Sequence, residues 1–96
     1  MLVIVAYDVN TLDKPGRKRL RKIAQACKNY GKRVQLSVFE CVVNKDQWVM
    51  LRAALLRIIN KEEDSLRIYF LDEEAKAKIE HHGIAKPLDL EEPLLI

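Results

Sequence analysis

The sequence has few of the residues from which common cofactor and metal sites are built. Three glycines in 96 residues leave no nucleotide-binding glycine loop, and no nucleophile-elbow or Cys-x-x-Cys motif is present. Cys27 and Cys41 lie fourteen residues apart, without metal-ligand spacing and within apolar patterns, so we expect buried, reduced thiols. The adjacent His81 and His82 would diverge in a strand or a helix, which indicates a surface pair rather than a chelating one.

Long apolar runs and leader sequences are also missing. No stretch approaches the roughly 18 apolar residues that a membrane span needs. The apolar N-terminus has neither a basic leader nor a cleavage-site pattern. We therefore expect a cytoplasmic protein with no membrane partner, whose residues 1–96 form one small domain. A chain of this size buries less than about 70% of its unfolded surface, so an additional interface would stabilise it.

Positive charge is concentrated in one segment. The sequence contains 17 Lys and Arg against 14 Asp and Glu, a net charge of +3. Nine of the basic residues lie between Lys14 and Arg33, a segment without Asp or Glu. Such a concentration is typical of a surface that binds nucleic acid or phosphate, although a solvated helix face would show the same pattern.

The hydrophobic pattern predicts alternating strands and helices. Residues 2–9 form an apolar run typical of a buried strand. Pro15 is placed to begin a helix that runs to about Asn29, with Gly31 as its C-terminal glycine. The β-rich segment 33–43 is predicted to be two strands joined by a turn near Leu36-Ser37. The remaining elements are a second amphipathic helix, a strand, an ambiguous charged stretch and a short apolar terminus: Lys45–Asn60, Ser65–Leu71, Glu73–Glu80 and Pro93–Ile96. This order predicts an α+β fold with ferredoxin-like βαββαβ topology and a short extra C-terminal strand.

The first strand also predicts a homodimer. Its residues are apolar on both faces, whereas two helices cover only one face of a sheet. The other apolar face must be covered, most simply by a second copy of the chain. The apolar residues Leu94–Ile96 are placed to add an edge strand to their own sheet or to the partner's.

Asp8 is the leading candidate for chemistry, because the apolar run Leu2–Tyr7 leads directly into it. Burying a carboxylate is unfavourable unless it is paired, hydrogen-bonded or bound to a cation. At a strand end, Asp8 either caps the Val9–Thr11 turn or forms part of a chemical site. A two-fold interface would bring two Asp8 carboxylates together, and a Mg²⁺ ion between them would polarise a phosphodiester and activate water.

Basic and aromatic residues near Asp8 in sequence are candidates for nucleic-acid contacts. In the predicted first helix, residues four apart share a face, which gives two rows suited to phosphates. These rows are Arg17 with Arg21, and Lys18 with Lys22. Arg19 lies in the same segment, and Arg33 would extend the patch from the next strand. Tyr7 and Phe39 are possible base-stacking groups, although core packing is the favoured role of each. Ser37 has no His–acid partner in sequence, so a hydrogen bond that holds the strand turn is favoured.

Three segments together resemble the CRISPR-associated Cas-two family. They are the strand end Tyr7-Asp8-Val9, the helix start Gly16-Arg17-Lys18-Arg19-Leu20 and the β-rich run 33–40, Arg-Val-Gln-Leu-Ser-Val-Phe-Glu. The apolar end Leu94–Ile96 fits as well, so the resemblance covers essentially the whole chain. It implies a homodimer of ferredoxin-like subunits that acts in CRISPR adaptation, the acquisition of new spacers in bacterial or archaeal antiviral defence.

The resemblance also implies partners and site residues. Family members pair with the integrase Cas-one and hold protospacer DNA, and several are described as Mg²⁺-dependent endonucleases of single-stranded RNA or double-stranded DNA. The family's metal-binding aspartate corresponds to Asp8. Other positions of its site or nucleic-acid surface correspond to Tyr7, Arg17, Arg19, Arg33, Ser37 and Phe39. The region 73–92 is less easily matched.

Two functions therefore remain open. In the first, the chain is a Mg²⁺-dependent phosphodiesterase in which Asp8 is catalytic. In the second, it is a non-catalytic scaffold that binds DNA through its basic helix and bridges Cas-one units. A stand-alone toxin-like ribonuclease on the same fold is a third interpretation. No residue pattern chooses RNA over DNA, because nothing is recognisable as a contact to a base edge or a 2′-hydroxyl.

Overall fold

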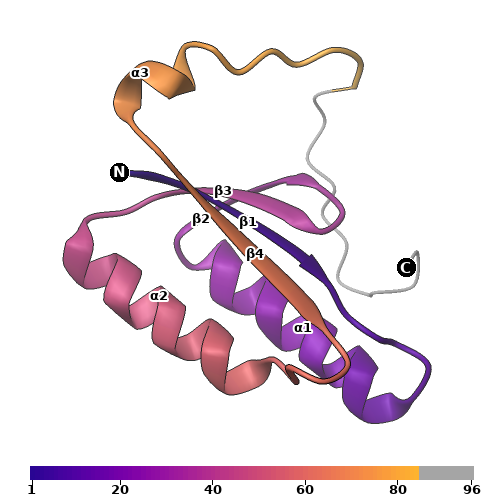
Figure 1. The fold of residues 1–96 in the computed structure, drawn as a ribbon. Helices are drawn as coiled ribbons and strands as arrows, with labels where there is room; N and C mark the ends of the chain where they lie inside the picture. The colour runs from indigo at the N-terminus through magenta and orange to yellow at the C-terminus, as the bar shows by residue number, and fades with distance from the viewer. Residues whose placement is uncertain (85–96) are drawn as a thin grey trace.

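The computed structural model describes residues 1–84 as an α+β fold (Figure 1). Its elements, in chain order, are β1 (Leu2–Asp8), α1 (Lys14–Lys28), β2 (Gly31–Gln35), β3 (Val38–Val42), α2 (Lys45–Ile58), β4 (Ser65–Leu71) and α3 (Glu73–Lys76). The strands and long helices expected from the sequence are present, with small shifts of their ends. The apolar terminus 93–96 and the extra strand predicted from it lie outside the described residues.

The four strands form one antiparallel sheet in the order β2-β3-β1-β4. The helices α1 and α2 lie side by side on one face of this sheet (Figure 1). Four strands in βαββαβ order, with both long helices on one face, confirm the predicted ferredoxin-like fold. Among residues 1–84, no helix is long and apolar enough to cross a membrane.

The core lies between the sheet and the two long helices. Alternate residues of β1 face it, because successive side chains of a strand point to opposite faces. The fully buried side chains of this layer are Val3, Val5, Ile23, Cys27, Phe39, Cys41, Leu51 and Leu55. Their burial holds β1 at the centre of the sheet, so the final residue of β1 emerges at a defined place.

Short polar side chains set where the two long helices begin. The Asp13 carboxylate accepts a hydrogen bond from Gly16 N at 2.9 Å, which caps α1, and Pro15 lies in the first turn. At α2, Asn44 Oδ1 accepts from Gln47 N at 2.8 Å, and Gln47 Oε1 accepts from Asn44 N at 2.9 Å. The Asp13 cap makes the connection from β1 to α1 a short, defined loop.

Two predictions about the segment between α1 and β3 had different outcomes. The turn at Leu36-Ser37 is confirmed, since it joins β2 to β3. The prediction that Gly31 ends the first helix is wrong, because Asn29 is the C-cap and Gly31 begins β2. A Cβ at Gly31 would lie 2.2 Å from the Glu40 carbonyl oxygen, so this glycine permits a close approach of two strands.

The second face of the sheet is apolar along β1 but also carries Glu40 and Arg67, and neither long helix covers it. Ile4 lies opposite Tyr69 of β4, and Ala6 lies opposite Val38 of β3. Val42 and Tyr69 are 59% and 43% exposed. We call the apolar part of this surface the open face; it consists of Ile4, Ala6, Val38, Val42 and Tyr69. Its composition agrees with the expectation that β1 is apolar on both sides.

Candidate functional site

Asp8 is the last residue of β1, on the same side of the sheet as the open face. Strand alternation places it on the side of Ala6, and its register partner on β4 is Ser65. Asp8 is exposed, and its carboxylate makes no hydrogen bond or ion pair with any of residues 1–84. The turn after β1 is capped instead by Asn10, whose Oδ1 accepts a hydrogen bond from Leu12 N at 3.0 Å. Turn capping therefore does not account for Asp8.

Asp8 is one carboxylate ligand rather than a complete metal centre. Residues 1–84 contain no group of three or more His, Cys, Asp or Glu side chains that could hold an ion. Mg²⁺ commonly takes one or two carboxylates and keeps several waters, so an exposed carboxylate such as Asp8 fits a hydrated Mg²⁺. A second carboxylate would come from a second copy if two open faces met around a two-fold axis.

Four exposed basic side chains project from one face of α1. They recur at spacings of three and four residues and line one shallow depression beside Pro15. We call them the basic stripe, which consists of Lys14, Arg17, Lys18 and Arg21. The stripe begins with the first residue of α1, soon after Asp8 in the chain, and Arg17 Nη1 donates to the Thr11 carbonyl oxygen at 3.2 Å. Its cationic groups face solvent and are suited to contact phosphates.

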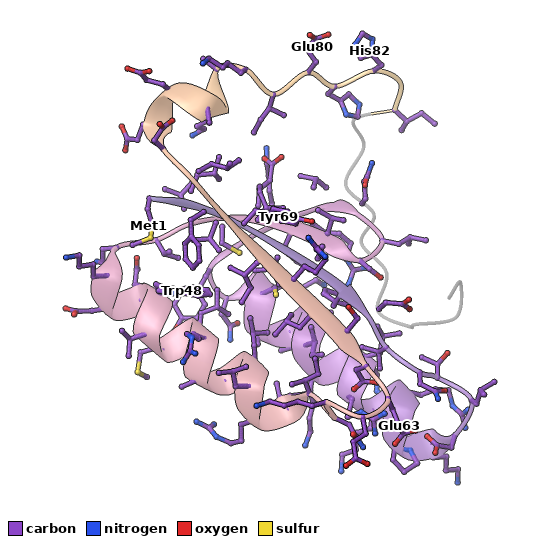
Figure 2. All side chains as sticks on the ribbon, viewed as in Figure 1. Met1, Trp48, Glu63, Tyr69, Glu80 and His82 are labelled. Atoms are coloured by element: carbon purple, nitrogen blue, oxygen red, sulfur yellow. The ribbon has the colours of Figure 1, made fainter. Side chains whose placement is uncertain are left out.

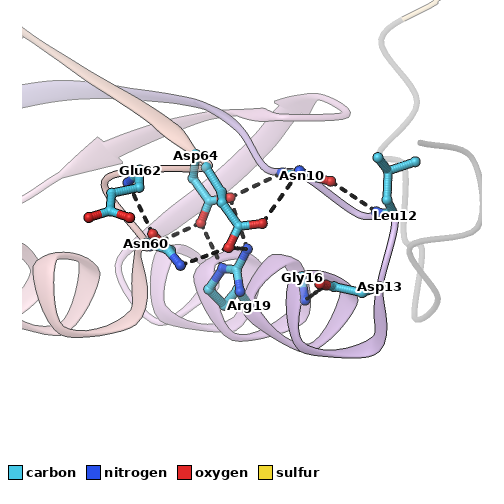
Figure 3. A network of polar contacts seen from close by, with 9 residues as sticks. Asn10, Leu12, Asp13, Gly16, Arg19, Asn60, Glu62 and Asp64 are labelled. Carbon is cyan, nitrogen blue, oxygen red and sulfur yellow. Dashed lines mark hydrogen bonds and ion pairs between the residues drawn. The ribbon is translucent and has the colours of Figure 1, made fainter.

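Arg19 does not belong to the stripe, although it lies in the same segment. Its Nε and Nη2 donate to Asp64 Oδ2 and Oδ1 at 2.7 and 3.2 Å, as Figure 3 shows. The hydrogen bond to Asp64 raises the pKa of Arg19. Burial acts to raise the pKa of Asp64, but Arg19 and two backbone amides outweigh it and hold that pKa below its ordinary value. Arg19 is therefore held in an internal ion pair rather than in the basic stripe.

Tyr7 and Phe39 belong to the core rather than to a base-stacking surface. They are 6% and 0% exposed, and their rings stack with centroids 6.3 Å apart. Arg33 lies over the Phe39 ring, with Cζ 5.3 Å from its centroid, on the sheet face opposite Asp8. Burial raises the pKa of Tyr7 to about 12 against the opposing positive charge of Arg33. Core packing, the role favoured for both residues, is confirmed, because the alternation that exposes Asp8 turns both rings inward.

Ser37 lies in the β2–β3 turn and reaches β1 through its backbone. Its carbonyl oxygen accepts a hydrogen bond from Tyr7 N at 3.1 Å. This bond holds the turn beside the end of β1, next to Asp8 in the chain. The main-chain carbonyl of Ser37 makes this bond, so the predicted role of its hydroxyl stays a prediction.

The cysteines and histidines lie where the sequence predicts. Cys27 and Cys41 are buried, and burial raises their thiol pKa to about 12 and about 11, so both stay protonated near neutral pH. His81 and His82 are exposed beyond α3, and His82 Nε2 lies 3.0 Å from Glu80 Oε1 (Figure 2). None of these side chains adds a metal ligand or a nucleophile beside Asp8.

Two residues of this region were missed as site candidates. Lys14 had a detectable signal, because it precedes Arg17 by three residues and Lys18 by four on the predicted helix. Asp64 had none, because its partner Arg19 is 45 residues away in sequence. A long-range ion pair of this kind becomes visible when the fold brings the two segments together.

Known proteins share both the sequence and the fold. A family model described as CRISPR associated protein Cas2 matches residues 1–79. A CRISPR-associated endoribonuclease Cas2 from Chlorobaculum tepidum is 53% identical over 96 residues, which is 100% of both chains. A CRISPR-associated endonuclease Cas2 from Halalkalibacterium halodurans is 53% identical over 95 residues, 99% of each chain. The crystal structure of Streptococcus pyogenes Cas2 covers 86% of this chain and 100% of its own, with 46% identity and a TM-score of 0.78. By sequence and by fold, the chain belongs to the CRISPR-associated Cas2 family.

Proposed function

We propose that this chain is a Mg²⁺-dependent endonuclease of single-stranded RNA or double-stranded DNA, acting as a cytoplasmic homodimer in CRISPR adaptation. The observation that carries the proposal is the position of Asp8, an exposed carboxylate that ends a central strand on the sheet face that α1 and α2 leave open. The relatives from C. tepidum and H. halodurans are named an endoribonuclease and an endonuclease, which supports the same chemistry.

The homodimer rests on the open face. Its apolar side chains alternate with those of the core, and Val42 and Tyr69 are exposed in one protomer. Because a two-fold contact uses the same patch on both subunits, pairing of open faces would bury these side chains in each of the two subunits. Asp8 lies at the end of the same side of the sheet, so the contact would also bring the two carboxylates toward each other.

In such a dimer, the chain's own residues would have separate tasks. The basic stripe would hold phosphates electrostatically and set the register of the nucleic acid. Two Asp8 carboxylates close together repel each other unless a proton or a cation lies between them, so their pairing favours Mg²⁺. The bound ion would supply Lewis acidity for the phosphodiester and lower the pKa of the attacking water.

The decisive experiment is cleavage of end-labelled single-stranded RNA and duplex DNA by wild type, Asp8→Asn and Arg57→Gln, with and without Mg²⁺. Asp8→Asn removes the charge but keeps the size of the side chain. We expect Mg²⁺-dependent cleavage by wild type and its loss in Asp8→Asn. Arg57→Gln is the control, because it removes an exposed positive charge from the last turn of α2 and should cleave normally. Cleavage by Asp8→Asn at the wild-type rate would refute the assignment.

The basic stripe favours a second function, a non-catalytic DNA-binding scaffold that bridges units of the integrase Cas-one. Its four cations face solvent on α1 and require no Asp8 carboxylate to contact phosphates. If the chain is a scaffold, neither wild type nor Asp8→Asn cleaves RNA or DNA. The Asp8→Asn variant should still bind duplex DNA, whereas the double variant Arg17→Gln/Arg21→Gln should bind it more weakly. Duplex binding measured in EDTA beside the cleavage assay therefore separates the two functions.

A further inference from the structure

The Asp64 carboxylate joins three segments that are distant in sequence. Its side chain has no exposed surface. Oδ1 accepts from Asn10 N at 3.0 Å and from Arg19 Nη2 at 3.2 Å, while Oδ2 accepts from Arg19 Nε at 2.7 Å and from Asn60 N at 3.0 Å. Figure 3 shows this arrangement, in which both oxygens are fully used. The loop after β1, the helix α1 and the loop before β4 are thus held by one group.

The three segments surround the end of β1. Asn10 follows Asp8 by two residues, and its amide is held directly by Asp64. On the neighbouring strand, Asp64 immediately precedes Ser65, which is the register partner of Asp8. The carboxylate of Asp64 therefore restrains the main chain around Asp8 in two ways: through Asn10 just after β1, and through Ser65 at the start of β4.

The guanidinium of Arg19 is held by its hydrogen bonds to Asp64. Both of its bonds to Asp64 come from one edge of the planar group, which is the fork geometry that arginine provides and lysine does not. Nη2 also lies 4.0 Å from Glu63 Oε2, and the Arg19 side chain is 14% exposed. A guanidinium held through two hydrogen bonds by a buried carboxylate is poorly placed to take up a phosphate as well.

We propose that Arg19 is a positioning residue, which through Asp64 holds the main chain around Asp8 in the geometry that binds Mg²⁺, and that it does not contact nucleic acid. This inference rests on the proposed role of Asp8. In this proposal Asp64 is a positioning residue as well, which contacts neither substrate nor ion. The effect of either residue should thus be seen in the Mg²⁺ requirement of the reaction rather than in nucleic-acid affinity.

The test compares wild type with Arg19→Lys, Arg19→Gln, Asp64→Asn and Arg17→Gln, with Arg57→Gln as the control. Arg19→Lys keeps the charge and removes the fork, so it separates positioning from simple attraction of phosphates. The Mg²⁺ concentration for half-maximal cleavage is measured at a temperature where circular dichroism shows folded protein. The salt dependence of duplex binding is measured separately in EDTA. A variant that is unfolded is set aside. Arg19→Lys and Asp64→Asn alter the two sides of the same ion pair, so each tests its positioning role independently.

We expect Arg19→Lys and Asp64→Asn each to raise the half-maximal Mg²⁺ concentration by about 10-fold or more, the usual effect of losing a group that supports a metal ligand. Arg19→Gln should leave the slope of log K against log salt unchanged, whereas Arg17→Gln should reduce its magnitude by about 0.9 for each duplex phosphate that the variant no longer neutralises. Normal Mg²⁺ dependence in Arg19→Lys, or a slope in Arg19→Gln reduced as in Arg17→Gln, would overturn the inference.

The same series separates failure of this inference from failure of the proposed function. If Asp8→Asn cleaves like wild type, the proposed function fails, and positioning around Asp8 fails with it. If Asp8→Asn is inactive but Arg19→Lys and Asp64→Asn keep the wild-type Mg²⁺ requirement, the function stands and the inference alone is refuted. The salt slopes need no cleavage, so they decide whether Arg19 contacts phosphates in every case.

Discussion

Replacing Gly16 with alanine should destabilise this protein, although alanine is the better helix former. Gly16 is buried in the first turn of α1, directly against the loop that follows β1. A Cβ built on it would lie 1.8 Å from the Asn10 carbonyl oxygen, whereas real Cβ atoms essentially never approach within 3.0 Å. The helix and the loop would have to separate by about 1.2 Å to accept the methyl group.

Two opposing contributions set the size of the effect. Alanine is favoured over glycine by about 1 kcal/mol in a helix interior. Overpacking that shifts the backbone costs about 1–3 kcal/mol, and the upper part of this range applies because the obstacle at Gly16 is a main-chain carbonyl. We therefore expect Gly16→Ala to lower the free energy of unfolding by about 1–2 kcal/mol.

Urea unfolding at one fixed protein concentration provides the measurement, since association would make stability depend on concentration. With a slope of about 1–3 kcal/mol per molar urea, the midpoint should fall by about 1 M. Lys22→Ala is the control, because Lys22 is exposed on α1 and its loss should change stability by less than about 0.5 kcal/mol. A Gly16→Ala protein as stable as wild type would mean that the Asn10 carbonyl does not lie against α1.

Burial and exposure of single side chains give three further predictions. The raised pKa values of Tyr7, Cys27 and Cys41, about 12, 12 and 11, mean that the unfolded state releases these protons first. The free energy of unfolding, measured by urea titration, should therefore fall as the pH rises from about pH 9 toward about pH 12, by up to about 1.4 kcal/mol per pH unit and group. Phe39→Ala should lower the free energy of unfolding by about 3–5 kcal/mol, because the ring is 0% exposed, and a loss below about 1 kcal/mol would contradict its core position. Asp8→Asn should change that free energy by less than about 0.5 kcal/mol at neutral pH, whereas a loss near 1 kcal/mol would restore the capping role.

Local patterns in the sequence were sufficient for most of the fold. The β1 run, the spacing of Leu20 and Ile23 on α1 and the turn at Leu36-Ser37 act over a few residues, where strand and helix periods are visible. Gly31 was misjudged because a helix-ending glycine and a glycine in a crowded strand look alike in sequence. The contact that distinguishes them, with the Glu40 carbonyl, is made across the β2–β3 pair.

Some features of the candidate site were also visible in local sequence, and others depend on tertiary contacts. Asp8 was identifiable because a carboxylate directly after a buried strand is visible within ten residues of sequence. The sequence by itself also determined that α1 is basic, which follows from the absence of acids between Lys14 and Arg33. Tertiary structure alone decided which cations remain available, because Arg19 meets its Asp64 partner 45 residues away, where two loops and a helix converge. The strength of an ion pair depends on distance and burial in space, and neither quantity is contained in the local order of residues.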